Sequence, residues 1–273
     1  MPPPVILNGA QRSEEFVSID RVIMALIKDK GICIRSTDYS ESSQILTFFT
    51  LSSGKISLIA KGSRRTKSPF SAPIEICSVA DLVYSLRENE KMGTLTEFNP
   101  TFFCIGIRKK LLALNAAFFA AELLNLSTKE HDPHPELFEQ SVLLLQRLDE
   151  NPENKVLPFL ILFELSLLMY AGSQPLTDIC ANCKRKFDAN WKQYYFSLSS
   201  GGLVCRDCEP AFIDKKILPY EAALILNNPQ KIFDAQKNSL IQIEKLLIDY
   251  MTYVLEKKPR TAQMILQLIR TTV

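Results

Sequence analysis

The sequence predicts an α+β protein with more than one domain: a small closed β-barrel, followed by an α-helical domain that carries an inserted four-cysteine module. Hydrophobic residues alternate with a period of two from about residue 25 to residue 100, which is typical of strands. After Pro100 the period changes to 3.6, which is typical of helices with one apolar face. Two Cys-x-x-C pairs interrupt the helical part.

Length and composition agree with this organisation. The chain has 273 residues, of which 47% are hydrophobic and 23% charged, so it can bury a sizeable core. Residues 1–23 carry little pattern, and Met24 opens a stretch that resembles a natural start. We therefore expect an N-terminal extension at 1–23, a barrel at 24–102 and a helical domain at 103–273, with the four-cysteine module at 178–210.

Five strands are expected in the barrel. Runs rich in β-branched and aromatic residues occupy residues 31–35, 44–50, 55–61, 74–86 and 93–98, and polar or glycine-containing turns separate several of them. No strong helical pattern lies between these runs. Closure into a barrel suits such a set of short strands, because it removes exposed sheet edges.

Six helices are expected after the barrel, at residues 108–126, 136–148, 155–170, 219–226, 239–256 and 260–270. The most apolar run, 156–171, is interrupted by Pro158 and Glu164 and is shorter than the roughly 20 residues that span a bilayer. We interpret it as a buried core helix and expect no membrane partner. The N-terminus also lacks the basic and apolar regions of a signal peptide.

Four of the seven cysteines form the sharpest motif in the chain. Cys180 and Cys183 make one Cys-x-x-C pair, and Cys205 and Cys208 make the other, with 21 residues between the pairs. Two such pairs complete a tetrahedral thiolate shell that suits Zn²⁺ and leaves no open position for water. We therefore predict a structural zinc site. The alternative is a redox dithiol, which needs only one pair.

The other three cysteines, Cys33, Cys77 and Cys104, are expected to be buried apolar residues, the first two of them in strands. An odd number of cysteines does not resemble a secreted disulfide framework, so a reducing, cytoplasmic location is expected. Only two histidines occur, His131 and His134, so a general base has few candidates. The sequence therefore predicts no catalytic residues and no enzyme activity.

A basic segment lies within the expected barrel. No acidic residue occurs between Glu41 and Glu75, and this window holds the basic residues Lys55, Lys61, Arg64, Arg65 and Lys67. Four of the five fall in the loop 61–67, and Arg35 flanks this loop on the first strand. We interpret the segment as a surface that follows the phosphates of a nucleic-acid strand, and the alternative is a merely solvated loop. Five such contacts predict a log–log salt slope of about −3.5 on single strands.

The whole-chain charge of +2 conceals this segment, because the remainder of the chain is slightly acidic. The barrel part of the chain also holds aromatic candidates for stacking on nucleic-acid bases. Tyr39, Phe70 and Tyr84 are candidates, and each is equally compatible with a place in the core.

Several segments resemble the bacterial DNA repair and recombination family RecO. They are residues 38–43, 47–50, 54–65 and 93–97 in the barrel, and residues 201–205 together with the cysteine pairs, which resemble the zinc-containing members of the family. The likeness runs from Met24 nearly to the C-terminus and keeps the order of the motifs. The resemblance implies an oligonucleotide/oligosaccharide-binding (OB) barrel followed by a helical domain with a zinc module.

The resemblance also implies a recombination mediator. Such a protein binds single- and double-stranded DNA, anneals complementary strands, works with RecR, and helps to load RecA onto strands coated with single-strand-binding protein. It implies DNA contacts from the third barrel strand and the following loop, although Ser57 stands where some members carry a basic residue. It further implies that the helical domain docks the tail of single-strand-binding protein, which is acidic and ends in hydrophobic residues. It also implies that the protein is located at the bacterial nucleoid. The alternative function is a zinc-stabilised adaptor whose barrel binds another protein.

Overall fold

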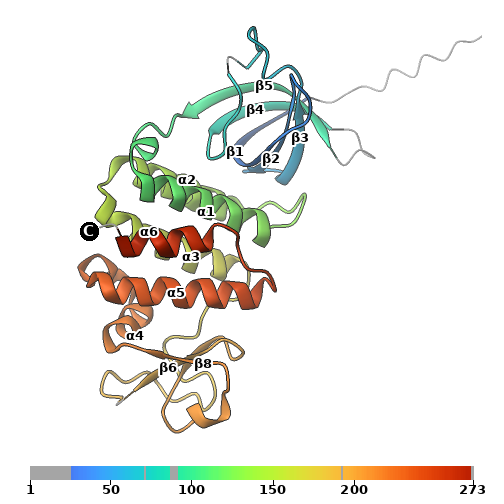
Figure 1. Cartoon of the computed structure of the whole chain (residues 1–273). Helices are drawn as coiled ribbons and strands as arrows, with labels where there is room; N and C mark the ends of the chain where they lie inside the picture. The colour runs from blue at the N-terminus through green and yellow to red at the C-terminus, as the bar shows by residue number, and fades with distance from the viewer. Residues whose placement is uncertain (1–25, 71, 87–91, 192, 272–273) are drawn as a thin grey trace, which may run out of the picture.

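The computed structural model describes residues 26–70, 72–86, 92–191 and 193–271, and the expected extension at 1–23 lies outside them. Figure 1 shows a barrel at one end of the molecule, layers of helices in the middle and a small β-module at the other end. The described residues contain no helix long and apolar enough to cross a membrane.

The prediction of a five-stranded barrel is confirmed. The strands β1 (Leu26–Asp38), β2 (Gln44–Thr50), β3 (Gly54–Ala60), β4 (Val79–Ser85) and β5 (Gly93–Phe102) close in the order β1-β2-β3-β5-β4. All neighbours are antiparallel except β3 and β5. Closure depends on β1, whose first half pairs with β4 and whose second half pairs with β2. A bulge between Cys33 and Arg35 bends this strand around the barrel.

Two strand predictions need correction. The first strand runs from Leu26 rather than from residue 31, because its N-terminal half pairs with β4. The fourth begins at Val79 rather than at residue 74, and Cys77 lies in the turn before it with a left-handed φ of 69°. The backbone of Ile74 instead forms two hydrogen bonds with the buried Gln44 side chain. The Gln44 Nε2 group donates to the Ile74 carbonyl, and Gln44 Oε1 accepts from the Ile74 backbone N–H. Cys33, Cys77 and Cys104 are all buried, as expected.

All six helices are present: α1 (Leu111–Ser127), α2 (Pro135–Glu150), α3 (Val156–Tyr170), α4 (Tyr220–Asn227), α5 (Lys237–Val254) and α6 (Ala262–Thr271). The first begins three residues later than expected, after the single 3₁₀ turn η1 (Ile107–Lys109) and an extended Lys110. The Lys110 ammonium donates to the carbonyls of Leu148, Asp149 and Asn151 at 2.6–2.8 Å, which ties this junction to the end of α2.

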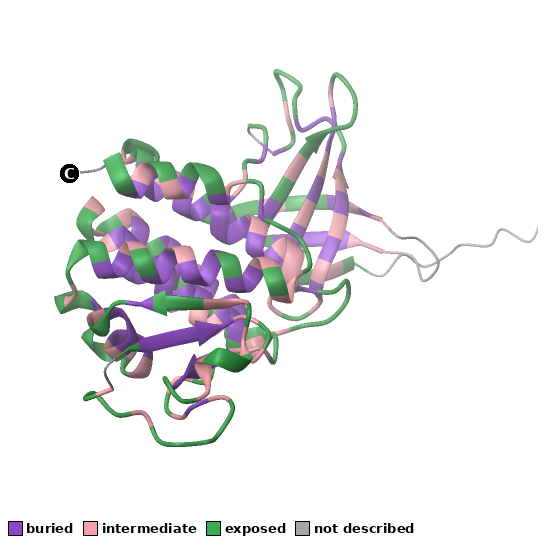
Figure 2. Ribbon diagram, turned by 60° about the horizontal axis from the view of Figure 1, so that its bottom comes forward, coloured by how far each residue is buried: buried purple, intermediate pink, exposed green. Residues whose placement is uncertain are grey.

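One continuous core joins the helices to the outer face of the barrel. Ile32, Ile34 and Phe49 point outward from β1 and β2 and pack with α1 and α2, whereas Cys33, Leu46 and Phe48 fill the barrel interior. Figure 2 shows the buried residues on the facing sides of the helices and along the barrel strands. The helix α3 is apolar on almost all sides because other elements surround it.

The four-cysteine module contains a three-stranded sheet in the order β7-β6-β8. The sheet consists of the hairpin β6 (Tyr194–Ser197) and β7 (Gly202–Val204), which lies between the two cysteine pairs, and of β8 (Lys215–Leu218), which follows them. In Figure 1 the module lies at the end of the molecule opposite to the barrel. Any role of its cysteines is therefore separate from contacts made at the basic loop.

Candidate functional site

The basic loop after β3 is held at its base and free at its tip. The buried Gly62 has a left-handed φ of 74°, and its amide donates to the Ser43 hydroxyl at 3.4 Å. The Arg64 amide donates to the Ser42 carbonyl at 3.2 Å, which joins the loop to the turn between β1 and β2. These contacts fix where the chain leaves the barrel, so that the following side chains project into solvent.

Four predicted DNA-binding residues meet on this loop. Lys61, Arg64, Arg65 and Lys67 are all exposed. The Arg64 guanidinium lies 2.7 Å from the Asp38 carboxylate, and in the described chain Lys61, Arg65 and Lys67 form no ion pair. Three cationic groups are therefore available to an anion, and the fourth is held in place at their side.

Arg35 and Lys55 lie elsewhere. Arg35 is exposed on β1, opposite Thr47 of β2 and outside the loop. Lys55 faces the helical domain, and its ammonium donates to the carbonyls of Asn125 at 2.8 Å and Thr128 at 2.5 Å, at the C-terminal end of α1. Burial lowers the pKa of Lys55, although the nearby Glu130 opposes this effect. This placement argues against a DNA contact by Lys55, because its hydrogen-bond donors already cap a helix.

The candidate stacking residues are also separated. Tyr84 is fully buried in the barrel and donates to the Ser53 hydroxyl at 2.8 Å. Phe70 is buried at the end of the basic loop, with 8% of its surface exposed. Tyr39 lies in the turn between β1 and β2 and is 61% exposed. Its neighbour Asp38 forms the ion pair with Arg64, so Tyr39 lies beside the basic loop. Tyr84 therefore belongs to the core, and Tyr39 remains open to a ligand.

The fold brings the four predicted zinc ligands together. The Sγ atoms of Cys180, Cys183, Cys205 and Cys208 all lie within 4.8 Å of one another, and those of Cys183 and Cys205 are 3.8 Å apart. Zn–S bonds of about 2.3 Å place the sulfurs of a tetrahedral site roughly 3.8 Å from one another. The donor set and its spacing therefore fit a tetrahedral metal ion.

Each cysteine pair sits on a tight turn. The Lys184 amide donates to the Cys180 carbonyl at 3.0 Å, with Lys184 in a left-handed conformation, and the Cys208 amide donates to the Cys205 carbonyl at 3.0 Å. An ion pair of 2.8 Å between Arg185 and Asp207 links the two turns. Cys180 and Cys205 are buried in a small apolar cluster of the module, which contains Tyr195 and Val204.

The protein surroundings favour a thiolate at Cys180. Burial acts to raise the pKa of this thiol, but the backbone amides of Cys205, Cys183 and Asn182 outweigh it and lower the pKa to about 7. The amide of Cys205 approaches the Cys180 sulfur at 3.4 Å. Burial and the neighbouring thiols raise the pKa of Cys205 to about 12, so this thiol needs a bound cation to ionise at neutral pH.

Two further features escaped the sequence analysis. Glu164 on α3 and Glu244 on α5 form a fully buried pair of carboxyl groups; Glu164 was noticed only as an interruption of an apolar run. A groove of about 530 Å³ lies between α2, α3 and the 3₁₀ helix η4 (Pro229–Asp234). Arg147 and Phe233 line it, and Arg147 lies 5.1 Å from the centre of the Phe159 ring. The only sequence signal for it was the apolar character of these helices.

Comparison with known proteins identifies both parts of the chain. A sequence model described as "Recombination protein O N terminal" matches residues 24–102, and one described as "Recombination protein O C terminal" matches residues 108–263. The two matches coincide with the barrel and with most of the helical region, including the four-cysteine module.

Individual relatives carry the name DNA repair protein RecO. The protein of Rhodopirellula baltica is 33% identical over 181 residues, 66% of this chain and 66% of that protein. The protein of Bacillus pumilus is 31% identical over 183 residues, 67% of this chain and 68% of that protein. The protein of Dehalococcoides mccartyi strain CBDB1 is 28% identical over 239 residues, 85% of this chain and 92% of that protein. The matched stretch therefore spans about two thirds of the first two relatives and most of the third.

Proposed function

The chain belongs to the RecO family of DNA repair and recombination proteins, and from this premise we propose that it is a recombination mediator that binds DNA and anneals complementary strands. It works with RecR to load RecA onto single strands coated with single-strand-binding protein. The observation that carries the DNA-binding part is the loop 61–67, where exposed cationic groups project from an anchored turn. No chemical step is involved, and the protein is not an enzyme.

The proposed mechanism begins with charge neutralisation. Lys61, Arg65 and Lys67 contact phosphates of a DNA strand, and Arg64, held by Asp38, adds a fourth cationic group beside them. Neutralisation lowers the repulsion between two strands, so that complementary bases can meet and Watson–Crick pairing supplies the specificity. Three to four contacts predict a log–log salt slope of about −2 to −3 on single strands, because each contributes ~0.7.

The test is a triple variant of the loop, Lys61→Ala, Arg64→Ala and Arg65→Ala. It is expected to weaken DNA binding at low salt and to reduce the salt slope by about 2, since each lost phosphate contact removes ~0.7. The matched control replaces the exposed basic residues Lys257, Lys258 and Arg260 at the far end of α5, and it should bind as the native protein does. Native affinity and slope in the loop variant would refute the proposal and favour the protein-binding adaptor.

We propose Zn²⁺ as the ion held by the four cysteines, in a structural role. Zinc supplies a fixed tetrahedral centre that ties the two turns together, because the module has only a small apolar cluster of its own. Metal analysis should give about one zinc per chain. Cys180→Ser combined with Cys205→Ser should lose the metal and unfold the module at a lower temperature. A metal-free native protein with the same melting temperature would contradict this role.

The groove between α2, α3 and η4 is our candidate for docking the tail of single-strand-binding protein. Its walls are mostly apolar. Arg147 together with Lys155, whose ammonium lies 5.5 Å from the centre of the Phe233 ring, places positive charge at its edge. An acidic tail with a hydrophobic end matches both features. A labelled tail peptide should bind about 10-fold more weakly to Arg147→Ala, since a hydrogen bond to a charged group contributes about 1.5 kcal/mol or more. Arg270→Ala, on the exposed face of α6, is the control.

A further inference from the structure

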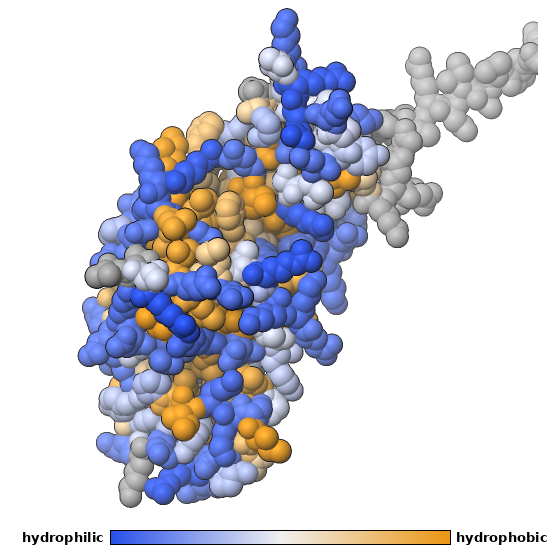
Figure 3. Space-filling model, in the orientation of Figure 1, coloured by the Kyte–Doolittle hydropathy of each residue, from blue (hydrophilic) through white to orange (hydrophobic). Residues whose placement is uncertain are grey.

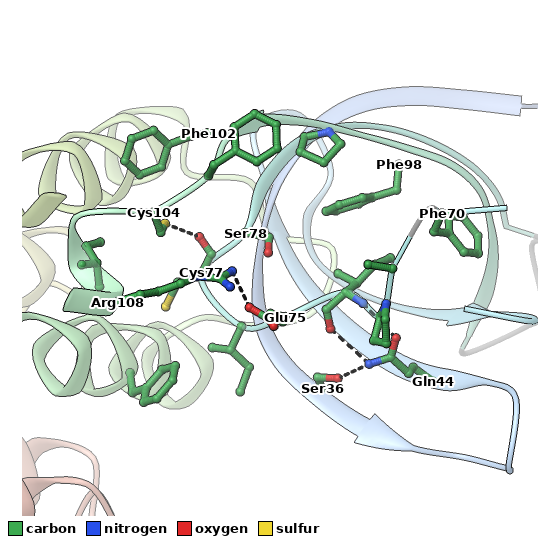
Figure 4. A pocket seen from close by; sticks show the side chains of 18 of the residues that line it. Ser36, Gln44, Phe70, Glu75, Cys77, Ser78, Phe98, Phe102, Cys104 and Arg108 are labelled. Atoms are coloured by element: carbon green, nitrogen blue, oxygen red, sulfur yellow. Dashed lines mark hydrogen bonds and ion pairs between the residues drawn. The ribbon is translucent and has the colours of Figure 1, made fainter. Parts of the chain in front are cut away.

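A second groove runs along the junction between the barrel and the helical domain, and the proposed function does not use it. It encloses about 720 Å³, which is the size of a ligand-binding cleft, and it is lined by the loop before β4, by β5 and by the start of α1. Figure 4 shows Phe70, Phe98 and Phe102 following one another from the barrel side towards the helices. In Figure 3 apolar side chains gather in the region between the barrel and the helical layers.

Two more aromatic rings of this groove are open to solvent. Phe103 is 64% exposed and Phe118 on α1 is 37% exposed, and both line the groove. Neighbouring exposed aromatic rings are costly in water and mark a surface that binds something. The backbone next to Phe103 is held in place, because the following residue, Cys104, adopts a left-handed φ of 48° and its thiol donates to the Cys77 carbonyl at 3.4 Å.

The barrel side of the groove also carries polar groups, Gln44 and Ser36. Gln44 is 95% buried there, and its amide donates to the Ser36 hydroxyl at 2.9 Å and to the Ile74 carbonyl at 3.1 Å. Since the Ser36 hydroxyl accepts this bond, its own proton is free to donate to a ligand. Aromatic faces combined with such a hydroxyl suit a flat heterocycle better than an aliphatic side chain.

The charges around the groove favour a polyanion. Lys67, a cation of the basic loop that forms no ion pair with the described residues, precedes Phe70 by three residues, so the two lie within roughly 11 Å along the chain. Glu75 is the acidic side chain of the lining, and its ion pair with Arg108 neutralises it. A strand whose phosphates follow the loop therefore has its next bases at the mouth of the groove.

We propose that this junction groove binds unstacked bases of single-stranded DNA, with the aromatic rings as the stacking platform. The inference rests on the proposed function, since the same strand contacts the basic loop. In a duplex the adjacent base pairs cover both faces of each base, so the groove selects single strands, whereas the basic loop binds the phosphates of either form. Bases held in the groove are separated from one another and remain close to the loop on which annealing begins.

The test compares two oligonucleotides of equal length and charge, one with bases and one fully abasic, by fluorescence anisotropy. The native protein should bind the strand with bases at least 10-fold more tightly, since stacking on one ring changes affinity by roughly 5- to 100-fold. Phe103→Ala with Phe118→Ala should remove this preference and leave the abasic strand, duplex DNA and the salt slope unchanged. The control is Ile105→Ala, which is 61% exposed in the same junction and does not line the groove.

The outcomes separate this inference from the proposed function. If the native protein binds both oligonucleotides equally, or the double variant keeps its preference, the base site is refuted while DNA binding by the loop stands. If the native protein binds neither oligonucleotide at any salt concentration, the proposed function fails, and the base site fails with it.

Discussion

The buried carboxyl pair predicts how the stability of the helical domain depends on pH. Glu164 and Glu244 are fully buried where α3 packs on α5, and none of their oxygens reaches a partner elsewhere in the described chain. Burial, and then the neighbouring carboxyl, raises the pKa of Glu164 well above its usual value. Burial raises the pKa of Glu244 to about 8. Both groups are therefore protonated in the native state at neutral pH.

The direction of the effect follows from proton linkage. In the unfolded chain a glutamic acid loses its proton near pH 4.3, whereas native Glu244 keeps it to about pH 8. Between these values the native state binds more protons, so the free energy of unfolding falls as pH rises, by about 1.4 kcal/mol per pH unit for each proton. From pH 5 to pH 7 Glu244 alone accounts for about 2–3 kcal/mol, and Glu164 acts in the same direction.

The assay is thermal unfolding at pH 5 and pH 7, where about 2–3 kcal/mol corresponds to roughly 5–10 °C in Tm. The glutamine of the Glu244→Gln variant cannot titrate. The Tm of this variant should therefore change between pH 5 and pH 7 by about 5–10 °C less than the Tm of the native protein. The control Glu139→Gln, at an exposed site on α2, should follow the native protein. The pKa values of Glu122 and Asp214 are lowered, so the stability that these two carboxylates contribute is lost only below pH 5, outside the range of the assay. An identical pH dependence in Glu244→Gln and the native protein would refute the reasoning.

Two further predictions concern contacts that hold the parts of the molecule together. Lys55→Met removes two hydrogen bonds to the end of α1 and should cost about 1–3 kcal/mol in urea unfolding, with DNA affinity unchanged. Weaker DNA binding at native stability would instead make Lys55 a DNA contact. Asp214→Asn weakens the bonds that this carboxylate accepts from the Ser199 amide and the Ser197 hydroxyl, and should cost about 1–2 kcal/mol at pH 7. Because these bonds lower the pKa of Asp214, the difference should shrink as pH falls through that pKa; a constant difference would contradict this assignment.

Local patterns were sufficient for most of the elements. In β3 the alternation holds, since Ile56, Leu58 and Ala60 are buried on the face that the strand turns to the barrel interior. The hydrophobic pattern gave wrong boundaries where contacts between residues distant in the sequence determine the backbone conformation. Residues 74–77 have the composition of a strand, but the Gln44 side chain binds the backbone of Ile74, and Cys77 turns left-handed. The helix expected from Arg108 begins only at Leu111, because the Lys110 side chain binds carbonyl groups at the end of α2.

For the candidate sites, spacing along the chain was informative only within short segments. The Cys-x-x-C pairs and the basic loop each bring their side chains together through a few residues of turn, so the sequence indicated them directly. Lys55 was grouped with that loop because it lies on the preceding strand, yet its ammonium binds α1 some 70 residues away in the sequence.

By itself, then, the sequence determined the two kinds of hydrophobic period, the four-cysteine motif, the basic loop and the family to which the chain belongs. Only the tertiary structure decided which cations remain free, which carboxyl groups are buried together, and that aromatic rings of the barrel and of α1 share one groove. The physical reason is that hydrophobic periodicity shows which face of a helix or strand is buried. The free cations, the carboxyl pair and the groove depend instead on which elements pack against each other. Glu164 meets Glu244 and Phe98 joins Phe118 in one groove only because α3 packs on α5 and the barrel rests on α1.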